Sequence, residues 1–416
     1  MKKICVLGLG YIGLPTALIL ASKGFTVVGV DVNKKIVNMI NNGKLPFNEP
    51  GLEGLYKIAE SNFTARTTVE NADVYLIAVP TPLEKWAKMA DLKYVRTATE
   101  MILPYLSHDG LVILESTVPP GTSDSIVIPI LEKSGLKPGE FHFAHCPERA
   151  IPGNTIYEMI HNDRVIGVLD KKSGELARHI YSSFVKGRLY LTDLRTAEFV
   201  KLMENSYRDV NIALANEFAQ IGEELNINIW EAIELANKHP RVNILKPGPG
   251  VGGHCIPVDP WFLVESSVRS RLVSLAREIN DSMPRYVLRI VKEIGIKPPG
   301  TITILGVAYK GNIDDTRESP ALKFIKLAEN EGYTVKIHDP YVRSFEYKIM
   351  ELKEAVKDSD CLVVITDHTA FKKINPEDVG GLMRNKNIID CRNLLDRQKW
   401  VKAGFNIRIL GNKKSN

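Results

Sequence analysis

Cys255 is the residue of this chain whose side chain is best suited to covalent chemistry. It lies near the end of the segment 248–259, which reads Gly-Pro-Gly-Val-Gly-Gly-His-Cys-Ile-Pro-Val-Asp. Glycine and proline are both unfavourable inside helices, so we expect a loop here. Glycines carry no Cβ and let a backbone approach a ligand closely. The loop therefore offers a thiol to a ligand, with the carboxylate of Asp259 about one turn further on.

The other cysteines give no sign of a metal site. They lie far apart in the sequence and lack the Cys-x-x-Cys spacing of zinc ligands. Cys5 and Cys361 fall in apolar segments, where packing is the ordinary role of a thiol. We therefore expect no bound metal. A loop cysteine is often only a small buried residue, so the case for Cys255 depends on the rest of the chain.

Residues 4–31 carry a dinucleotide-binding pattern. A short apolar strand precedes the glycine turn 8–13, an apolar helix follows, and a second strand ends on Asp31. Gly8 makes the tight turn, Gly10 admits the pyrophosphate to the helix N-terminus, and Gly13 lets helix and strand pack. Asp31 can accept hydrogen bonds from the ribose hydroxyls and would repel a 2′-phosphate. The sequence therefore predicts NAD rather than NADP.

Apolar strand-like segments continue to alternate with helical patterns up to residue 191. This alternation predicts a mostly parallel sheet with helices on both faces. Ligands of such sheets bind beyond the carboxyl ends of the strands, so the turns at Pro80-Thr81 and at Thr117 should border the cofactor. A third strand end supplies Glu148, which would otherwise be an ordinary surface charge. The expected strands are Ile4–Leu7, Phe25–Val30, Val74–Val79, Leu111–Glu115, Phe141–Ala144, Arg164–Val168 and Leu189–Leu191.

A long helix is expected from Arg195 to about Leu225. Phe199, Met203, Tyr207, Val210, Leu214 and Phe218 recur along it at helical spacing. On a neighbouring face Lys201 and Asn205 are four residues apart and hence side by side. A helix of this length between two domains is also a candidate for dimerisation. A second long helix is expected from Leu272 to about Ile294.

The last part of the chain repeats the nucleotide-binding unit in degenerate form. A strand from Thr301 to Leu305 opens on Gly306, and a helix and a strand ending on Asp339 follow. The glycine fingerprint is missing, so we expect a different nucleotide here. The predicted fold is α/β, with two Rossmann-like doubly wound parallel-sheet domains joined by a long central helix. The three segments are residues 1–193, 194–297 and 298–416.

Length and composition exclude several classes of protein. A chain of 416 residues exceeds what one core usually holds, so two or three domains are expected. Its net charge is only +5 and its basic residues are spread out, which argues against nucleic-acid binding. It has no long apolar run and no cleavable leader pattern, so we expect a cytoplasmic protein that does not bind a membrane.

A reactive thiol beside an NAD domain indicates a particular oxidation. Oxidation of an alcohol needs no cysteine. An aldehyde that is to be oxidised further benefits from a thiol, which adds to the carbonyl and yields a thiohemiacetal. Loss of a second hydride then gives a thioester that water can cleave. Lys201, or another nearby cation, is the candidate for activating the thiol.

The chain closely resembles the UDP-glucose/GDP-mannose dehydrogenase family over essentially its whole length. The matching motifs are the glycine fingerprint, Asn48-Glu49-Pro50-Gly51-Leu52, Val79-Pro80-Thr81-Pro82, Glu115-Ser116-Thr117-Val118-Pro119, the helix with Lys201 and Asn205, the Gly-Gly-x-Cys loop, and Asp314-Asp315-Thr316-Arg317-Glu318-Ser319-Pro320. Members of this family use NAD to oxidise the C6 alcohol of a nucleotide sugar to a carboxylate, a four-electron reaction.

The resemblance implies a role for each catalytic residue. Cys255 is the nucleophile, and Lys201 stabilises oxyanionic intermediates. Asn205 and Asp259 position the catalytic water. Glu148 matches a family position implicated in proton transfer, and the threonine at 117 matches one that holds the water.

The resemblance also implies which residues bind the cofactor and the nucleotide sugar, and that the assembly is a homodimer or a dimer of dimers. In a dimer, Arg241 would reach from the partner subunit toward the sugar. The implied NAD contacts are Gly8, Gly10, Tyr11, Ile12, Gly13, Asp31, Pro80, Thr81, Thr117 and Arg317. The implied substrate contacts are Glu148, Arg149, Lys201, Asn205, Arg241, Gly252, His254, Tyr309, Lys310 and Arg392.

Two positions next to the catalytic residues bear on the sugar. UDP-glucose members typically have serine before the cysteine and lysine before the aspartate, where this chain has His254 and Val258. Together with Pro260-Trp261-Phe262, these residues resemble the branch that acts on UDP-N-acetylmannosamine. An apolar Val258 suits an acetyl group better than a lysine would. UDP-N-acetylglucosamine is the close alternative, followed by UDP-glucose.

Two other functions fit part of the pattern. A two-electron hydroxyacid dehydrogenase shares the cofactor fold and the lysine and asparagine on a helix. It predicts one NADH per substrate and an active Cys255→Ala variant. A non-catalytic sensor of NAD or of a nucleotide sugar predicts binding without formation of NADH.

Overall fold

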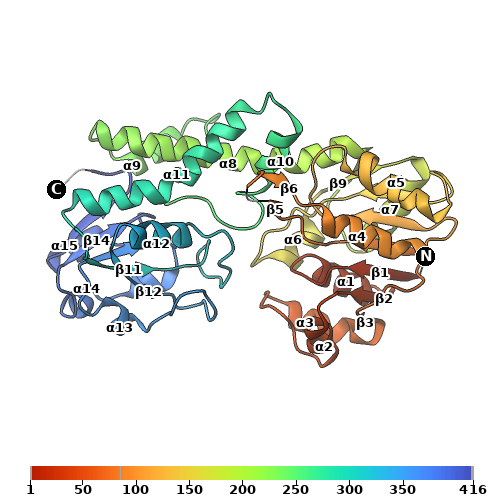
Figure 1. The fold of residues 1–416 in the computed structure, drawn as a ribbon, viewed down its shortest axis with the longest axis horizontal. Helices are drawn as coiled ribbons and strands as arrows, with labels where there is room; N and C mark the ends of the chain where they lie inside the picture. The colour runs from red at the N-terminus through yellow and green to blue at the C-terminus, as the bar shows by residue number, and fades with distance from the viewer. Residues whose placement is uncertain (1, 85, 414–416) are drawn as a thin grey trace. The chain divides into compact units, whose positions relative to one another are not determined.

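The computed structural model describes residues 2–84 and 86–413 as an α/β protein in two compact units (Figure 1). The first unit comprises Met1–Glu204 and Trp261–Ser267, and the second comprises Asn205–Pro260 and Val268–Asn416. Each unit is built around its own sheet of mainly parallel strands. The predicted α/β class with two Rossmann-like domains is confirmed, whereas the segment boundaries at residues 193 and 297 stay predictions.

The sheet of the first unit has the strand order of dinucleotide-binding domains. Starting from β3, the order β3-β2-β1-β4-β7-β8 corresponds to 3-2-1-4-5-6, and the strand order reverses between β1 and β4, which run parallel. Neighbouring strands run parallel, except that β8 and β9 pair antiparallel. From one edge to the other the strands are β10 (Leu189–Asp193), β9 (Arg164–Val168), β8 (His142–His145), β7 (Leu111–Leu114), β4 (Val74–Ile77), β1 (Lys3–Leu7), β2 (Thr26–Val30) and β3 (Phe63–Arg66).

Both faces of this sheet are covered, because successive side chains of a strand point to opposite sides. Ile4 and Val6 of β1 pack with α1 and α7, whereas Cys5 and Leu7 pack with α4 and α5. The central strands therefore read as continuous apolar runs. The helices of this unit are α1 (Gly13–Ser22), α2 (Lys34–Asn41), α3 (Leu52–Ala59), α4 (Lys93–Ile102), α5 (Ile128–Leu131), α6 (Thr155–His161) and α7 (Lys171–Ser182), and a small hairpin joins β5 (Leu83–Glu84) to β6 (Met89–Ala90).

The second unit contains a five-stranded parallel sheet in the order 2-1-3-4-5, counted from β11. The central part of the chain contributes two helices to this unit, α9 (Ile229–Ala236) and α11 (Arg271–Glu293). Helix α10 (Asp259–Ser266) begins in this unit. In spatial order the strands are β12 (Thr334–His338), β11 (Thr301–Leu305), β13 (Cys361–Val364), β14 (Asn387–Asp390) and β15 (Asn406–Ile409). The remaining helices are α12 (Pro320–Asn330), α13 (Leu352–Val356), α14 (Pro376–Gly380) and α15 (Arg397–Lys402).

The turns after β1 and β11 share their backbone geometry, which supports the internal repeat. Gly8 and Gly306 have φ values of +94° and +90°, and each donates its N–H over 2.8 Å to the last carbonyl of the neighbouring strand. The residue after each glycine donates to an acid, Leu9 to Asp31 at 3.0 Å and Val307 to Asp339 at 2.7 Å. The two halves therefore use the same turn although only the first has the glycine fingerprint.

In the second copy, the carboxylate of Asp339 is engaged in hydrogen bonds with the protein itself. Asp339 is buried and accepts hydrogen bonds from four backbone N–H groups and, at 3.0 Å, from His368 Nε2. Burial alone would raise the pKa of Asp339, but the hydrogen bond and charge of His368, with the backbone donors of Val307 and Val342, lower it to about 2. An acid so enclosed cannot hold a ribose, in agreement with a different nucleotide here.

Replacing Asp339 with asparagine tests this arrangement. A folded-state pKa below the unfolded value means that the ion stabilises the native state at neutral pH, and that this contribution disappears as the pH falls from 3.8 to about 2. We expect Asp339→Asn to lose about 2 kcal/mol of unfolding free energy at neutral pH. Urea unfolding at several pH values should show the difference from wild type shrinking below pH 3.8, and a difference independent of pH would contradict the assignment.

Helix α8 (Leu194–Glu224) buries polar side chains and exposes apolar ones. Lys201 and Asn205 are only 6% and 0% exposed, whereas Phe199, Met203 and Tyr207 are 45%, 53% and 59% exposed. The side chains that the pattern would leave in solvent are thus inside, where Asn205 has hydrogen-bond partners. Within a single chain the apolar side chains of Phe199, Met203, Tyr207 and Leu214 remain exposed.

Candidate active site

The glycine turn of the first unit is shaped to receive a pyrophosphate. An added Cβ on Gly8 would lie 2.6 Å from the carbonyl oxygen of Ala78, and one on Gly13 only 1.9 Å from that of Gly8. On Gly10 the same Cβ would meet nothing within 4 Å. The outer glycines are therefore needed for packing, and the middle one keeps open the space in front of the N-terminus of α1, where N–H groups and the helix dipole favour an anion.

Asp31 is fixed at the end of β2 beside a hollow. Its two carboxylate oxygens accept hydrogen bonds from the N–H groups of Leu9 at 3.0 Å and Asn33 at 2.8 Å. A hollow of about 360 Å³ lies close by: Arg66, which lines it, accepts a hydrogen bond from the N–H of Asp31 through its carbonyl. An acid held in this way suits the ribose of NAD. The lining residues are Lys34, Val37, Asn38, Arg66, Thr67 and Thr68.

The turns beyond β4 and β7 lie together, and their contact with the cofactor stays a prediction. The hydroxyl of Thr81 donates to the carbonyl of Thr117 at 2.8 Å, and that of Ser116 donates to the carbonyl of Val79 at 2.6 Å. Pro80 is exposed between them. In the glycine turn itself, the ring of Tyr11 stacks on Phe47 with centroids 4.2 Å apart, while the neighbouring Ile12 is half-buried.

Glu148 is buried rather than a surface charge. Its Oε1 accepts hydrogen bonds from the N–H groups of Arg149 and Ala150 at 2.7 and 2.9 Å, and its Oε2 pairs with Arg164 at 2.8 Å. The Arg149 side chain is engaged elsewhere, with Nη2 2.6 Å from Glu204. Burial and three donors give Glu148 a fixed position, as an acid or base requires.

Glu115 is a buried carboxyl that belongs to a motif of the family resemblance but was given no role of its own. It accepts hydrogen bonds from Tyr181 at 2.7 Å and from Thr16 at 3.3 Å. Burial, together with the charge of Glu148 and against that of Arg164, raises the pKa of Glu115 to about 7. A charged residue directly after the apolar run Leu-Val-Ile-Leu was the available signal.

The side chains of Lys201 and Asn205 on α8 differ in their hydrogen bonding. Asn205 donates from Nδ2 to Oδ2 of Asp259 at 2.5 Å and accepts from Arg208. Within residues 2–84 and 86–413, the ammonium group of Lys201 makes neither a hydrogen bond nor an ion pair with the protein. Asn205 and Asp259, to which the resemblance assigns the catalytic water, are therefore hydrogen-bonded to each other, and the lysine keeps its donors for a ligand.

A buried polar network anchors the start of the cysteine loop. Asn216 of α8 accepts a hydrogen bond from the N–H of Gly248 at 2.8 Å and donates to Asn280 of α11 at 2.8 Å. Asn280 donates to Asp209 at 2.8 Å, and Arg277 pairs with the same carboxylate at 2.5 Å. Asn216 lies about three helical turns beyond Asn205, on the same face of α8. This spacing was the feature of the sequence from which the buried position of Asn216 could have been predicted.

The glycines before Cys255 let the loop lie against Tyr309. A Cβ on Gly252 would be 2.6 Å from Cβ of Tyr309, and one on Gly253 would be 3.1 Å from its ring. Gly253, with φ +94°, also donates to the carbonyl of Arg317 at 2.9 Å. Cys255 and His254 are half-buried, and Asp259 begins α10 directly after the loop. The loop thus brings Cys255 and Tyr309 into one region of the second unit.

The basic residues expected to bind ligands differ in their exposure and in their contacts with the protein. Arg392 lies against Gly248 and donates from Nε to the carbonyl of Ile365 at 2.8 Å. Arg317 is paired with Asp315, with Nη2 2.5 Å from Oδ2. Lys310 and Arg241 are exposed. Their contacts with NAD or substrate stay predictions.

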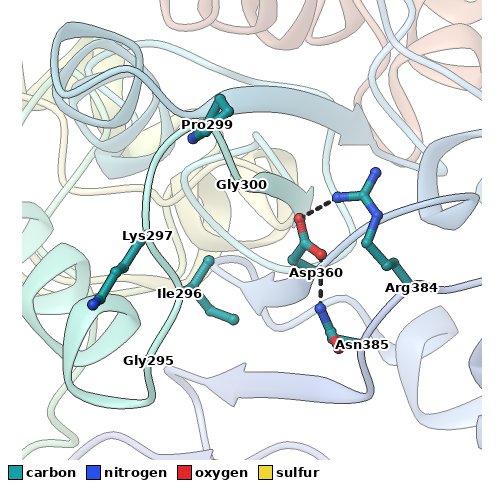
Figure 2. Close-up of a pocket in the computed structure, with 8 residues that line it drawn as sticks. All are labelled: Gly295, Ile296, Lys297, Pro299, Gly300, Asp360, Arg384 and Asn385. Carbon is teal, nitrogen blue, oxygen red and sulfur yellow. Dashed lines mark hydrogen bonds and ion pairs between the residues drawn. The ribbon is translucent and has the colours of Figure 1, made fainter.

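A separate pocket of about 290 Å³ lies at the other edge of the second sheet (Figure 2). It is located where β11 and β13 begin, whereas ligands of such sheets bind where strands end. Asp360 points toward Arg384 and Asn385 in Figure 2 and bonds both, and it also accepts from the N–H of Thr301. The carboxylate of Asp360 therefore has a structural role. The lining residues are Gly295, Ile296, Lys297, Pro299, Gly300, Asp360, Arg384 and Asn385.

Three regions of the chain match the three domains of one protein family, described as the UDP-glucose/GDP-mannose dehydrogenase family. Residues 2–185 match its NAD binding domain, residues 195–282 its central domain and residues 303–397 its UDP binding domain. The chain belongs to this dehydrogenase family.

Individual relatives of the dehydrogenase match over nearly its full length. A UDP-N-acetyl-D-mannosamine dehydrogenase of Methanocaldococcus jannaschii is 52% identical over 100% of this chain and 97% of its own. A structure of the UDP-D-ManNAc dehydrogenase from Pyrococcus horikoshii has a TM-score of 0.93 at 43% identity, covering 99% of both chains. An NDP-N-acetyl-D-galactosaminuronic acid dehydrogenase of Ralstonia nicotianae is 42% identical over 94% of this chain and 96% of its own.

The dehydrogenase uses NAD and oxidises a UDP-sugar, which confirms the expected cofactor and class of substrate. Among residues 2–84 and 86–413, no helix combines the length and the apolar character that crossing a lipid bilayer requires. The same residues include no group of three or more His, Cys, Asp or Glu side chains arranged to hold a metal ion.

Proposed function

We propose that the enzyme oxidises the C6 alcohol of UDP-N-acetyl-D-mannosamine to the carboxylate, using two NAD and one water, with Cys255 as nucleophile. The observation that carries the chemistry is the glycine loop that presents Cys255 next to Asp259, an acid held by Asn205. The relatives that bear this substrate in their names, at 43% and 52% identity, support the choice of sugar. UDP-N-acetylglucosamine is the alternative, and UDP-glucose the next.

The chain's residues divide the reaction between them. When bound, one NAD would supply the acceptor for the hydride that leaves C6 of the alcohol, and a second NAD would supply the acceptor for the hydride of the thiohemiacetal. Glu148 takes the proton of the alcohol, and the Cys255 thiolate adds to the aldehyde carbon while Lys201 stabilises the oxyanion. After the second oxidation the carbon is a thioester of Cys255. Water positioned by Asn205, Asp259 and the hydroxyl of the threonine at 117 cleaves it, releasing the carboxylate and the thiolate.

A panel of UDP- and GDP-sugars with NAD tests the proposal. For UDP-N-acetylmannosamine we expect two NADH per sugar and a product mass that corresponds to the uronic acid. A clear preference for UDP-N-acetylglucosamine or UDP-glucose would overturn the sugar but leave the mechanism. One NADH per sugar would favour a two-electron dehydrogenase, and binding without NADH would favour a sensor.

We also propose that the enzyme is a homodimer, or a dimer of dimers, that uses the exposed stripe of α8. Phe199, Met203, Tyr207 and Leu214 lie along one helix and are 40–59% exposed. Large apolar side chains gathered in this way are typical of a protein interface. Arg241 is exposed, as a residue that serves a partner subunit would be.

Met203→Asp is expected to weaken this dimer. An unpaired carboxylate placed in an apolar interface should raise the dimer Kd by roughly 30-fold or more. Sedimentation or light scattering over a range of concentrations measures the change. Arg178→Asp, an exposed substitution on α7, is the control and should leave the Kd unchanged. Equal Kd values for wild type and Met203→Asp would exclude the stripe as the interface.

A further inference from the structure

A closed cluster behind Glu148 contains one cation and two carboxyls. Arg164, Glu115 and Glu148 are 4%, 2% and 7% exposed. Arg164 begins β9, Glu115 directly follows β7, and Glu148 follows β8, so three neighbouring strands of the sheet supply the cluster. Two carboxylates around one guanidinium leave an excess negative charge that burial makes costly.

The guanidinium of Arg164 has donors to spare. Its Nη2 pairs with Glu148 at 2.8 Å and also bonds the carbonyl of Met159, while Nε and Nη1 are buried without a partner among the described residues. The guanidinium lies over the ring of Tyr181, 4.9 Å from its centroid, and the hydroxyl of this tyrosine donates to Glu115. Arg164 therefore has unused N–H groups, and its positive charge acts on Glu115.

Glu115 is the member of the cluster suited to lose a proton near neutral pH. Burial raises its pKa to about 7. The other titratable groups that face it are Tyr181 from α7, Arg164 from β9, and Cys146 and Glu148 from the segment after β8, and α1 supplies the hydroxyl of Thr16. Burial raises the pKa of Cys146 to about 12 and that of Tyr181 well above its usual value, so neither ionises near pH 7.

We propose that Glu115 is a positioning residue. Its protonation state determines whether the guanidinium of Arg164 pairs with Glu148 alone or with both carboxylates. With Glu115 protonated, the guanidinium holds Glu148 in place. When Glu115 releases its proton to solvent, the new carboxylate competes for the guanidinium through its free Nε and Nη1, and the hold on Glu148 loosens. This inference rests on the proposed role of Glu148 as acid and base.

Glu115→Gln tests the proposal because the amide fixes the neutral state. The ratio of kcat for the variant to kcat for wild type should be constant below about pH 6 and rise roughly fivefold above about pH 8, which corresponds to weakening the hold on Glu148 by about 1 kcal/mol. Tyr181→Phe removes a hydrogen bond that favours the ionised form and should move this step to higher pH. Glu175→Gln, on the exposed side of α7, should leave the profile unchanged.

Infrared spectroscopy of the enzyme without substrate supplies a readout that a merely structural role would not move. Wild type should show a carboxylic-acid band that titrates near pH 7 and that Glu115→Gln lacks. A missing band, or a flat kcat ratio, would overturn the proposal. If the band titrates but wild type makes no uronic product, the proposed function is wrong instead, so the two failures are distinguishable.

Discussion

Cys255→Ala is expected to stop the oxidation before the acid. Without the thiol no thiohemiacetal forms. The enzyme-bound carbon that would donate the second hydride is therefore missing. Formation of the carboxylate should fall on the order of a thousandfold or more, as when other enzymes lose their nucleophile. The first oxidation needs no thiol and should persist at the level of the aldehyde. The yield in a single turnover should drop from two NADH per sugar to at most one.

The measurement is NADH absorbance together with the mass of the product, trapped with hydroxylamine to capture an aldehyde. Cys361→Ala is the matched control, because Cys361 is a fully buried residue of β13. It should lower the unfolding free energy but keep two NADH per sugar. Full conversion to acid by Cys255→Ala would remove the thiol from the mechanism and favour direct oxidation of a hydrated aldehyde.

Most strands were predictable because they are buried on both faces. Val74–Ile77, Leu111–Leu114 and Cys361–Val364 have no exposed side, so they read as uninterrupted apolar runs bounded by turns. The strands that were missed lie at sheet edges, where fewer neighbours require apolar residues. β3 reads Phe-Thr-Ala-Arg and β15 reads Asn-Ile-Arg-Ile. Such short segments with alternating polarity carry little signal of their own.

The site was harder to predict than the fold because polar burial leaves no periodic trace. The fingerprint and the cysteine loop were visible in residue types and spacing, whereas the association of Asn205 with Asp259 followed only from the resemblance to the family. The partner of Glu148 was not, since Arg164 lies on another strand and meets it only in the folded sheet. On α8 the apolar stripe suggested the buried face, but a helix can bury charged residues where they have a function.

Replacing Gly10 and Gly13 separately should split cofactor binding from folding. Gly13→Ala puts a Cβ 1.9 Å from the carbonyl oxygen of Gly8, a backbone atom that cannot turn aside. We expect it to cost about 3 kcal/mol of stability or more, and NAD binding with it. Gly10→Ala meets nothing within 4 Å, so the protein should fold with an unchanged Tm.

The effect of Gly10→Ala should instead appear in the affinity for NAD. Its methyl group would occupy the space in front of α1 that the pyrophosphate needs, and loss of one or two charge-assisted hydrogen bonds would weaken binding roughly 100-fold. Calorimetric titration with NAD measures this, with thermal unfolding as the companion. Gly54→Ala, exposed on α3 with open space around it, is the control and should gain up to about 1 kcal/mol with unchanged affinity. Wild-type affinity in Gly10→Ala would mean that NAD does not approach the chain at this turn.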